Sequence, residues 1–186
     1  MLTLTSGELN TWIAAFLWPL ARVLGLIAAA PLFGNSAVPT TVKVMLGALL
    51  AMVIAPAIPA MPAANPTSMA GLLILAQEML IGLAMGFAMR IVFAAVEMAG
   101  EVASLTMGLG FASFFNPLSG GNASAISQFL ALIATMAFLA VNGHLVLIEV
   151  LAESFYTLPV SATPLSIGGP YELARWGGEI FRSGLQ

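Results

Sequence analysis

The segment from Met107 to Ser124 constrains the fold of this chain more than any other part of the sequence. It reads MGLGFASFFNPLSGGNAS and carries no charged side chain, and its glycines and its proline disfavour a continuous helix. The segments on both sides are long and apolar, as membrane helices are. Lipid cannot satisfy the N–H and C=O groups of irregular backbone, so such backbone is tolerated at membrane depth only when protein buries it or when it lines a cavity. The segment is therefore either a surface loop or an element inside an assembly, where it blocks or lines a path.

Three phenylalanines in this segment bear on that choice. A surface loop is the commoner case in general, but clusters of exposed phenylalanine are unusual outside interaction sites. Phe111, Phe114 and Phe115 therefore argue against an ordinary surface loop.

The composition is that of an integral membrane protein. Of the 186 residues, 60% are hydrophobic and 7% are charged, whereas a soluble domain carries roughly 25% charged residues. The sequence has no cysteine and no aspartate, which excludes disulfides and thiolate metal sites. The net charge of −3 is spread thinly, so the chain has no basic surface for nucleic acid. We therefore expect an all-α fold, a membrane-embedded bundle of helical hairpins.

Apolar and amphipathic segments predict where the helices lie. Pro19 and Arg22 interrupt the first of them, and Asn142-Gly143-His144 interrupts the fourth. The third exceeds the ~20 residues that cross a bilayer, so it must tilt, break or project from the membrane, with Gly82 and Gly86 as its weak points. The segments are 11–30, 43–54, 68–104, 123–140 (or as far as 152) and 171–186.

The basic residues do not fit a simple up-and-down path through the membrane. The chain has five Lys and Arg residues, and Lys43 places the first link between helices in the cytoplasm by the positive-inside rule. If the chain crosses the membrane four times, Arg175 and Arg182 then lie on the side opposite to the cytoplasm, against this rule. We interpret this conflict as evidence for helical hairpins that do not all cross.

One face of the third segment combines charges with small residues. Glu78, Gly82, Gly86 and Arg90 recur every four residues, which stacks them on one slowly drifting face of a helix. Gly82 and Gly86 form a small-xxx-small motif, which lets another helix approach closely. Glu78 and Arg90 are ~18 Å apart along a straight helix, so they cannot pair with each other. Either both snorkel from helix ends, or Glu78 faces a protein partner or a water-filled interior. We predict that this face makes helix-packing and subunit contacts.

The residue inventory excludes the familiar enzyme classes. The sequence has no His-Glu-x-x-His zinc motif, no Gly-x-Ser-x-Gly elbow and no Walker motif, and without aspartate it has no aspartyl protease dyad. His144 is the only imidazole, and beside Asn142 we interpret it as a hydrogen-bonded structural residue rather than a metal ligand. We expect no enzymatic activity, no cofactor and no metal.

The order of motifs along the chain resembles the FliR family, the export-gate component of bacterial flagella, which has close counterparts in type III secretion injectisomes. The motifs that carry the resemblance are, in order, Arg22, PLFG at 31–34, Pro39, EMLIGLAMGF at 78–87, Ala99-Gly100, MGLGFA at 107–112 with Pro117, FLAVNGH at 138–144, Ser154-Phe155 and Leu158-Pro159. The resemblance covers nearly the whole chain. It implies a single FliR-like membrane domain over 1–186 that lacks the further apolar C-terminal segments usual in the family.

The resemblance implies a place for the chain in an assembly. Its expected partners are FliP- and FliQ-like export-gate subunits, a FlhB-like subunit, membrane lipid and unfolded flagellar export substrates. Its expected location is the bacterial inner (plasma) membrane, at the flagellar basal body. In the family, the helical hairpins stand largely above the bilayer plane, which would fit the conflict in orientation.

The resemblance also implies that the segment from Met107 to Ser124 acts as a plug in the closed channel. Three aromatic side chains of ~150–250 Å² each can fill a narrow lumen, and a hydrophobic constriction blocks ions by dewetting. The alternative is that the phenylalanines only anchor the segment against neighbouring helices. The predicted plug and gating residues are Gly108, Gly110, Phe111, Phe114, Phe115, Asn116, Pro117, Gly120 and Gly121.

We therefore expect a component of the flagellar type III protein export gate that forms part of the channel wall and its plug. One alternative is a small-molecule transporter with a broken helix at the central segment and its ions near Glu78. Another is a structural membrane scaffold.

Overall fold

The computed structural model of the chain describes residues 6–34, 38–58, 65–66, 68–108 and 124–160. Within these ranges it contains helices and no strand, so the predicted all-α fold is confirmed. The predicted helix over 171–186 lies outside the described residues. The helices are α1 (Ser6–Ala29), α2 (Pro31–Gly34), α3 (Thr40–Ile54), the 3-10 turn η1 (Ala55–Ala57), α4 (Met69–Thr106), α6 (Ala125–Ala140) and α7 (Gly143–Thr157).

The longest element, α4, is one continuous helix of 38 residues. Ser68 caps its N-terminus, because the hydroxyl accepts a hydrogen bond from the N–H of Gly71 at 3.1 Å. The helix does not break at Gly82 or Gly86, where α1 packs against it. α1 likewise continues through Pro19, although a proline inside a helix removes one backbone hydrogen bond. The interruption expected there does not end the helix.

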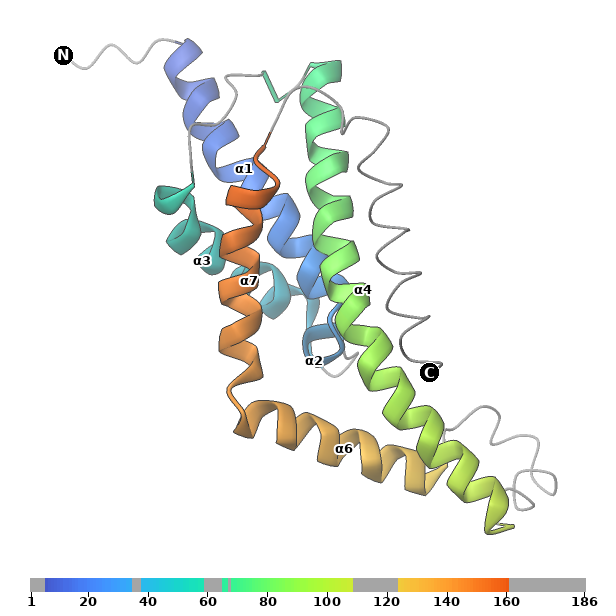
Figure 1. Cartoon of the computed structure of the whole chain (residues 1–186). Helices are drawn as coiled ribbons and strands as arrows, with labels where there is room; N and C mark the ends of the chain where they lie inside the picture. Colours follow the sequence, from blue (N-terminus) through green and yellow to red (C-terminus); the bar gives the residue numbers. More distant parts are fainter. Residues whose placement is uncertain (1–5, 35–37, 59–64, 67, 109–123, 161–186) are drawn as a thin grey trace.

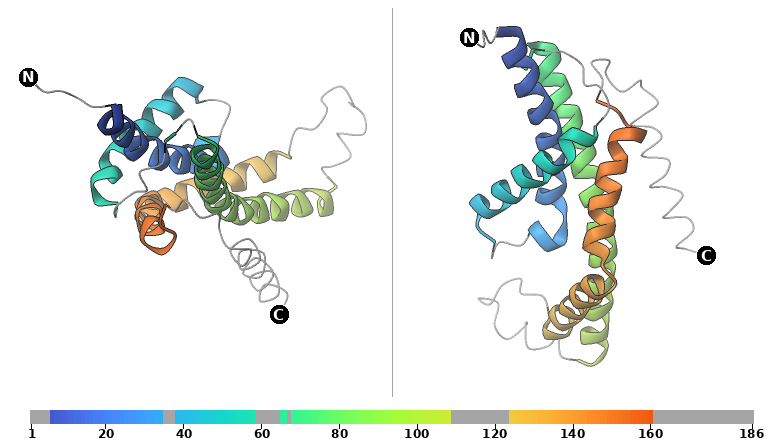
Figure 2. Two further views of the ribbon diagram at one scale, coloured as in Figure 1. Left: turned by 90° about the horizontal axis from the view of Figure 1, so that it is seen from above. Right: turned by 90° about the vertical axis from the view of Figure 1, so that its left-hand side faces the viewer.

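α1 and the first half of α4 lie side by side and run in the same direction (Figure 1). α7 runs the opposite way, and α6 lies across the far end of α4 (Figure 1). α3 packs against α1 and crosses it at a wide angle (Figure 2, right). The described chain is therefore an open bundle that is thick at the end where α1, α4 and α7 meet, and thin where α4 and α6 project.

The hydrophobic core lies at the thick end of this bundle. Trp18 and Val23 from α1, Ile74 from α4, and Leu151 and Phe155 from α7 are all buried there. Trp18 and Phe155 are fully buried, so the core depends on large side chains that three separate helices supply.

The fourth apolar segment of the sequence forms two helices that meet at a sharp bend. α6 and α7 are inclined by 68° to one another, with Val141 and Asn142 between them. Asn142 has the left-handed conformation, with φ 57° and ψ 27°, which Asn adopts more readily than most residues. The interruption predicted at this position is confirmed.

The described helices have the length and apolar character of membrane spans. Two stretches, Thr40–Ala57 and Met69–Thr106, are long and apolar enough to cross a bilayer, and the bent α6–α7 pair makes up to three if it counts as one span. Much of their apolar surface is exposed, for example at Met52, Phe87 and Phe129. The chain is thus an all-α membrane helical bundle whose apolar faces need lipid or protein to cover them.

Candidate functional site: a buried arginine that joins three helices

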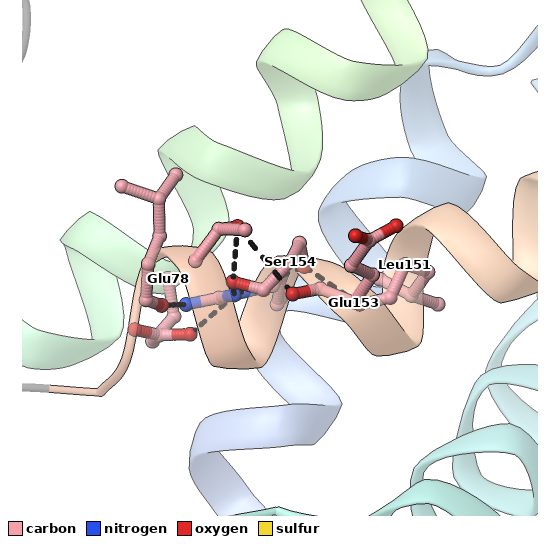
Figure 3. A network of polar contacts seen from close by, with 7 residues as sticks. Glu78, Leu151, Glu153 and Ser154 are labelled. Carbon is pink, nitrogen blue, oxygen red and sulfur yellow. Dashed lines mark hydrogen bonds and ion pairs between the residues drawn. The ribbon is translucent and has the colours of Figure 1, made fainter.

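The guanidinium of Arg22 lies at the centre of the described helices and joins α1 to α4 and α7. Its Nε donates to Oε2 of Glu78 at 2.7 Å. Its Nη1 donates to the carbonyl oxygen of Ser154 at 2.8 Å and to the Ser154 hydroxyl at 3.0 Å, and its Nη2 donates to the carbonyl oxygen of Leu158 at 2.8 Å. Figure 3 shows this polar network from close by, with Glu78 and Ser154 labelled and dashed lines for the bonds; Glu78 belongs to α4 and Ser154 to α7. One side chain therefore holds groups from two other helices.

Arg22 and Glu78 are both fully buried, which makes their pairing a condition for the fold. A charge at the centre of a bilayer costs at least ~2.5–3.5 kcal/mol on insertion scales, and removing one partner of a buried pair leaves the other uncompensated. Oε1 of Glu78 has no hydrogen-bond partner within the described residues. The carboxylate therefore depends on Arg22 for the bond that the structure gives it.

Arg22 also closes the C-terminus of α7. The last carbonyl groups of a helix have no partner inside the helix and carry its negative dipole end, which a cation stabilises. The carbonyl of Ser154 lies in the last turn of α7, where it also accepts the N–H of Leu158, and the carbonyl of Leu158 belongs to the residue that caps the helix; Arg22 binds both. The Arg22 Cζ atom also lies 4.0 Å from the centre of the Phe155 ring, a cation–π contact. The same residue thus neutralises Glu78 and caps α7.

Small residues let α1 and α4 touch through their backbones around Arg22. A Cβ atom added to Gly82 would lie 2.0 Å from the carbonyl oxygen of Arg22, and one on Gly25 would lie 2.5 Å from the carbonyl oxygen of Met79. At Gly86 the added atom would meet the Cβ of Ala29 at 2.7 Å. Because no side chain fits at these glycines, they fix the separation that places Glu78 opposite Arg22.

A second cluster of polar contacts joins the ends of α4 and α6. Oε2 of Glu101 accepts a hydrogen bond from the N–H of Ser124 at 3.1 Å, at the N-terminus of α6. The hydroxyl of Ser127 donates to the carbonyl oxygen of Glu97 at 2.7 Å, and a Cβ atom on Gly100 would lie 2.6 Å from the Cα of Ser127. We call these contacts the neck. The neck ties together the two helices that flank residues 109–123.

The bend between α6 and α7 is closely packed. A Cβ atom on Gly143 would lie 2.3 Å from the ring of Phe138, so the ring occupies the place of a side chain. Phe138 in turn packs edge-on against Phe93 of α4, with ring centres 5.8 Å apart. His144 beside the bend has a buried Nδ1 with no partner within the described residues, so the hydrogen bond expected there is not seen at that atom.

The structure brings together some of the residues singled out from the sequence and not others. Glu78, Gly82 and Gly86 lie on the buried face of α4 against α1, whereas Arg90 is exposed on the same helix. Their role in contacts between subunits remains a prediction. Of the predicted plug and gating residues, Gly108 is exposed with φ 75°, a conformation that glycine adopts without strain. The others, from Gly110 to Gly121, lie outside the described residues.

Sequence reasoning missed the part that Arg22 and Ser154 play. From the sequence alone, Arg22 is interpreted as an interruption of the first segment, and Ser154 is used only as part of a family motif. The available signal was that Arg22 and Glu78 are two opposite charges inside separate apolar segments. Such charges are rare and usually pair, which makes each the natural partner of the other.

Comparison with known proteins gives one consistent family. The family described as bacterial export proteins, family 1, matches residues 13–186. The flagellar biosynthetic protein FliR of Pectobacterium carotovorum subsp. carotovorum is 44% identical over 188 residues, which is 100% of this chain and 70% of that protein. FliR of Escherichia coli (strain K12) is 40% identical over 185 residues, with 100% and 70% covered. FliR of Bacillus subtilis (strain 168) is 30% identical over 146 residues, with 78% and 56% covered.

Proposed function

This chain belongs to the bacterial export proteins, family 1, and we propose that it is a subunit of the flagellar type III protein export gate, in the bacterial inner membrane at the flagellar basal body. The relatives that match the whole chain are named flagellar biosynthetic proteins, which supports a role in the flagellar export apparatus. Its partners in this proposal are FliP-, FliQ- and FlhB-like subunits, and its cargo is unfolded flagellar protein.

The length of α4 is the observation that carries a role inside an assembly. Its 38 residues extend for about 57 Å at 1.5 Å per residue, whereas the hydrocarbon core of a bilayer is about 30 Å thick. Fitting the whole helix into the core requires a tilt of about 60°, beyond the usual range of about 0–40°. Yet large apolar side chains are exposed along all of it, from Leu72 to Leu105. Part of this exposed apolar surface of α4 therefore needs protein neighbours rather than lipid.

Within the assembly we propose that the chain forms part of the channel wall and carries the plug. The neck at Glu101, Ser124 and Ser127 holds the two helices that lead into residues 109–123, so both ends of the proposed plug start from a fixed base. Phe111, Phe114 and Phe115 would fill the closed lumen, and the flanking glycines would let the segment change its backbone conformation.

The alternative of a small-molecule transporter with ions near Glu78 loses support from the buried network. Transporters coordinate ions with free carbonyls and carboxylates at broken helices. Here Arg22 binds one oxygen of the Glu78 carboxylate and two carbonyls at the end of α7, and its positive charge would repel a cation at this place.

Reconstitution with the proposed partners tests this function. We would express the tagged chain with FliP-, FliQ- and FlhB-like subunits, solubilise the membranes in mild detergent and purify on the tag. We expect the FliP- and FliQ-like subunits to co-purify in fixed proportion. Recovery of the well-folded chain alone, together with solute flux through vesicles that contain only this chain, would support the transporter instead.

A further inference from the structure

A small cavity lies where α1 ends against the middle of α4. Its volume is about 210 Å³, and its walls come from Ala29, Ala30 and Pro31 on one side and from Arg90, Phe93, Ala94 and Glu97 of α4 on the other. This volume leaves room for several water-sized groups. It is distinct from the buried Arg22 network, because the two share no residue and the charged residues of the cavity, Arg90 and Glu97, are exposed.

The charges around this cavity are unpaired and of both signs. Within the described part of the chain, no carboxylate lies within ion-pair distance of Arg90, and no basic group lies within that distance of Glu97. The two side chains are two turns apart on one face of α4, about 10 Å along the axis. The negative dipole end of α1 lies on the wall as well, since α1 ends at Ala29. The cavity thus offers the Arg90 guanidinium to an anion, and the Glu97 carboxylate and the carbonyl end of α1 to a cation.

If the membrane span of α4 starts at the first residue of the helix, Met69, then Arg90 lies at the other boundary of that span. A hydrocarbon core of about 30 Å takes about 20 helical residues, and counting from Met69 this brings the helix to about residue 89. The residue that follows is Arg90. Its neighbours Phe87 and Ile91 are exposed apolar side chains, at 60% and 53% relative exposure, and can contact acyl chains. An arginine at such a boundary is within reach of lipid phosphate groups.

We propose that this cavity binds the head group of a zwitterionic phospholipid with a primary ammonium, such as phosphatidylethanolamine. The phosphate would accept hydrogen bonds from the Arg90 guanidinium, which suits phosphate geometry. The ammonium would donate to the Glu97 carboxylate and to the carbonyl end of α1. A carboxylate from a neighbouring subunit would satisfy Arg90 but would be repelled by Glu97, whereas the zwitterion satisfies both charges. The proposal does not depend on the export function.

Lipid retention by the purified full chain tests the site. The chain is exchanged into detergent that contains equal amounts of phosphatidylethanolamine, phosphatidylcholine and phosphatidylglycerol, and native mass spectrometry counts the lipids that stay bound. We expect a preference for phosphatidylethanolamine, because the choline group cannot donate an N–H bond and the glycerol group carries no positive charge. Equal retention of the three lipids would overturn the proposal.

Two variants separate the two halves of the head group. Arg90→Gln should lower retention of all three lipids by about tenfold, which corresponds to about 1.4 kcal/mol. Glu97→Gln should keep the phosphate contact but abolish the preference for the ethanolamine lipid. Glu149→Gln, which alters an exposed carboxylate on α7, is the matched control and should change neither. Circular dichroism checks that all variants keep their helix content.

The competing occupant of the cavity is a protein. If Arg90→Gln leaves lipid retention at the wild-type level but lowers recovery of the complex with FliP- and FliQ-like subunits, then Arg90 contacts a partner's carboxylate and the lipid proposal is wrong. Wild-type lipid retention together with wild-type recovery of the complex would equally overturn it, because Arg90 would then bind neither.

Discussion

Nε of Arg22 lies 2.7 Å from Oε2 of Glu78, and both side chains are fully buried between α1 and α4. The two residues are 56 positions apart in the chain. Their pairing sets the register between two parallel helices, and the further bonds from Arg22 to Ser154 and Leu158 bring in α7. This arrangement links three helices at the thick end of the bundle, from which the far part of α4 projects.

Removing one member of the pair should destabilise the chain strongly. Arg22→Met leaves Glu78 buried without a partner, and we expect a loss of about 3–5 kcal/mol in the free energy of unfolding. The double variant Arg22→Met/Glu78→Leu removes both charges and should recover most of that loss. Unfolding of the purified chain in mild detergent, followed by circular dichroism, measures both. A double variant as unstable as Arg22→Met would show that the ion pair is not the source of the loss.

The arginine should not be replaceable by lysine. The planar guanidinium binds Glu78, Ser154 and Leu158 in three directions, whereas a lysine ammonium is a compact point charge. Arg22→Lys should therefore keep the α1–α4 contact but loosen the end of α7. Hydrogen exchange at the amides of residues 155–158 should become at least about tenfold faster, as expected when roughly 1.4 kcal/mol of local stability is lost. Unchanged protection at these amides would contradict the capping role of Arg22.

Close packing at Gly82 should tolerate no side chain. Gly82→Ala places a Cβ atom 2.0 Å from the Arg22 carbonyl oxygen, so α1 and α4 must separate. We expect the free energy of unfolding to fall by about 1–3 kcal/mol. Gly86→Leu should do the same and lower assembly with partner subunits while membrane insertion persists. Ala88→Leu on the exposed side of α4 is the matched control. Normal stability of Gly82→Ala would show that the two helices are not held at this separation.

The carboxylate of Glu101 should support the start of α6. It accepts a hydrogen bond from the N–H of Ser124, the residue that caps α6, and one such hydrogen bond contributes about 0.5–1.5 kcal/mol. Glu101→Ala should therefore speed hydrogen exchange of the amides in the first turn of α6, with little effect on α1. Glu149→Gln, on the exposed side of α7, serves as the control. Equal exchange rates in Glu101→Ala and the parent chain would show that the Glu101 contact does not hold the start of α6.

The positions of the helices were largely predictable from the sequence, because the membrane imposes long apolar segments. The third segment was predicted over 68–104 and forms α4 from Met69 to Thr106. The break at Asn142-Gly143 was also predictable, because these two residues interrupt a long apolar segment. Helix-to-helix approach at Gly82 and Gly86 was also expected from their spacing.

Side-chain pairing across the bundle was not predictable in the same way. Nothing in the local pattern states that Arg22 reaches Glu78 or that it caps α7, because those contacts depend on how three separate helices dock. Glu101 likewise binds the backbone of Ser124, which comes near only because α6 folds back on α4. In each case, tertiary packing decides the partner of a charged residue.

The ion permeability of the assembled complex tests the plug most directly. Residues 111–117 are deleted from the chain, the complex with its partner subunits is purified and placed in vesicles, and a membrane-potential dye reports ion leakage. If the phenylalanines seal the channel, we predict an intact complex that is leaky to small ions, whereas the parent complex is tight. If they only anchor the segment, the deletion should disrupt assembly without added conductance. An intact deletion complex with unchanged ion tightness would contradict the plug.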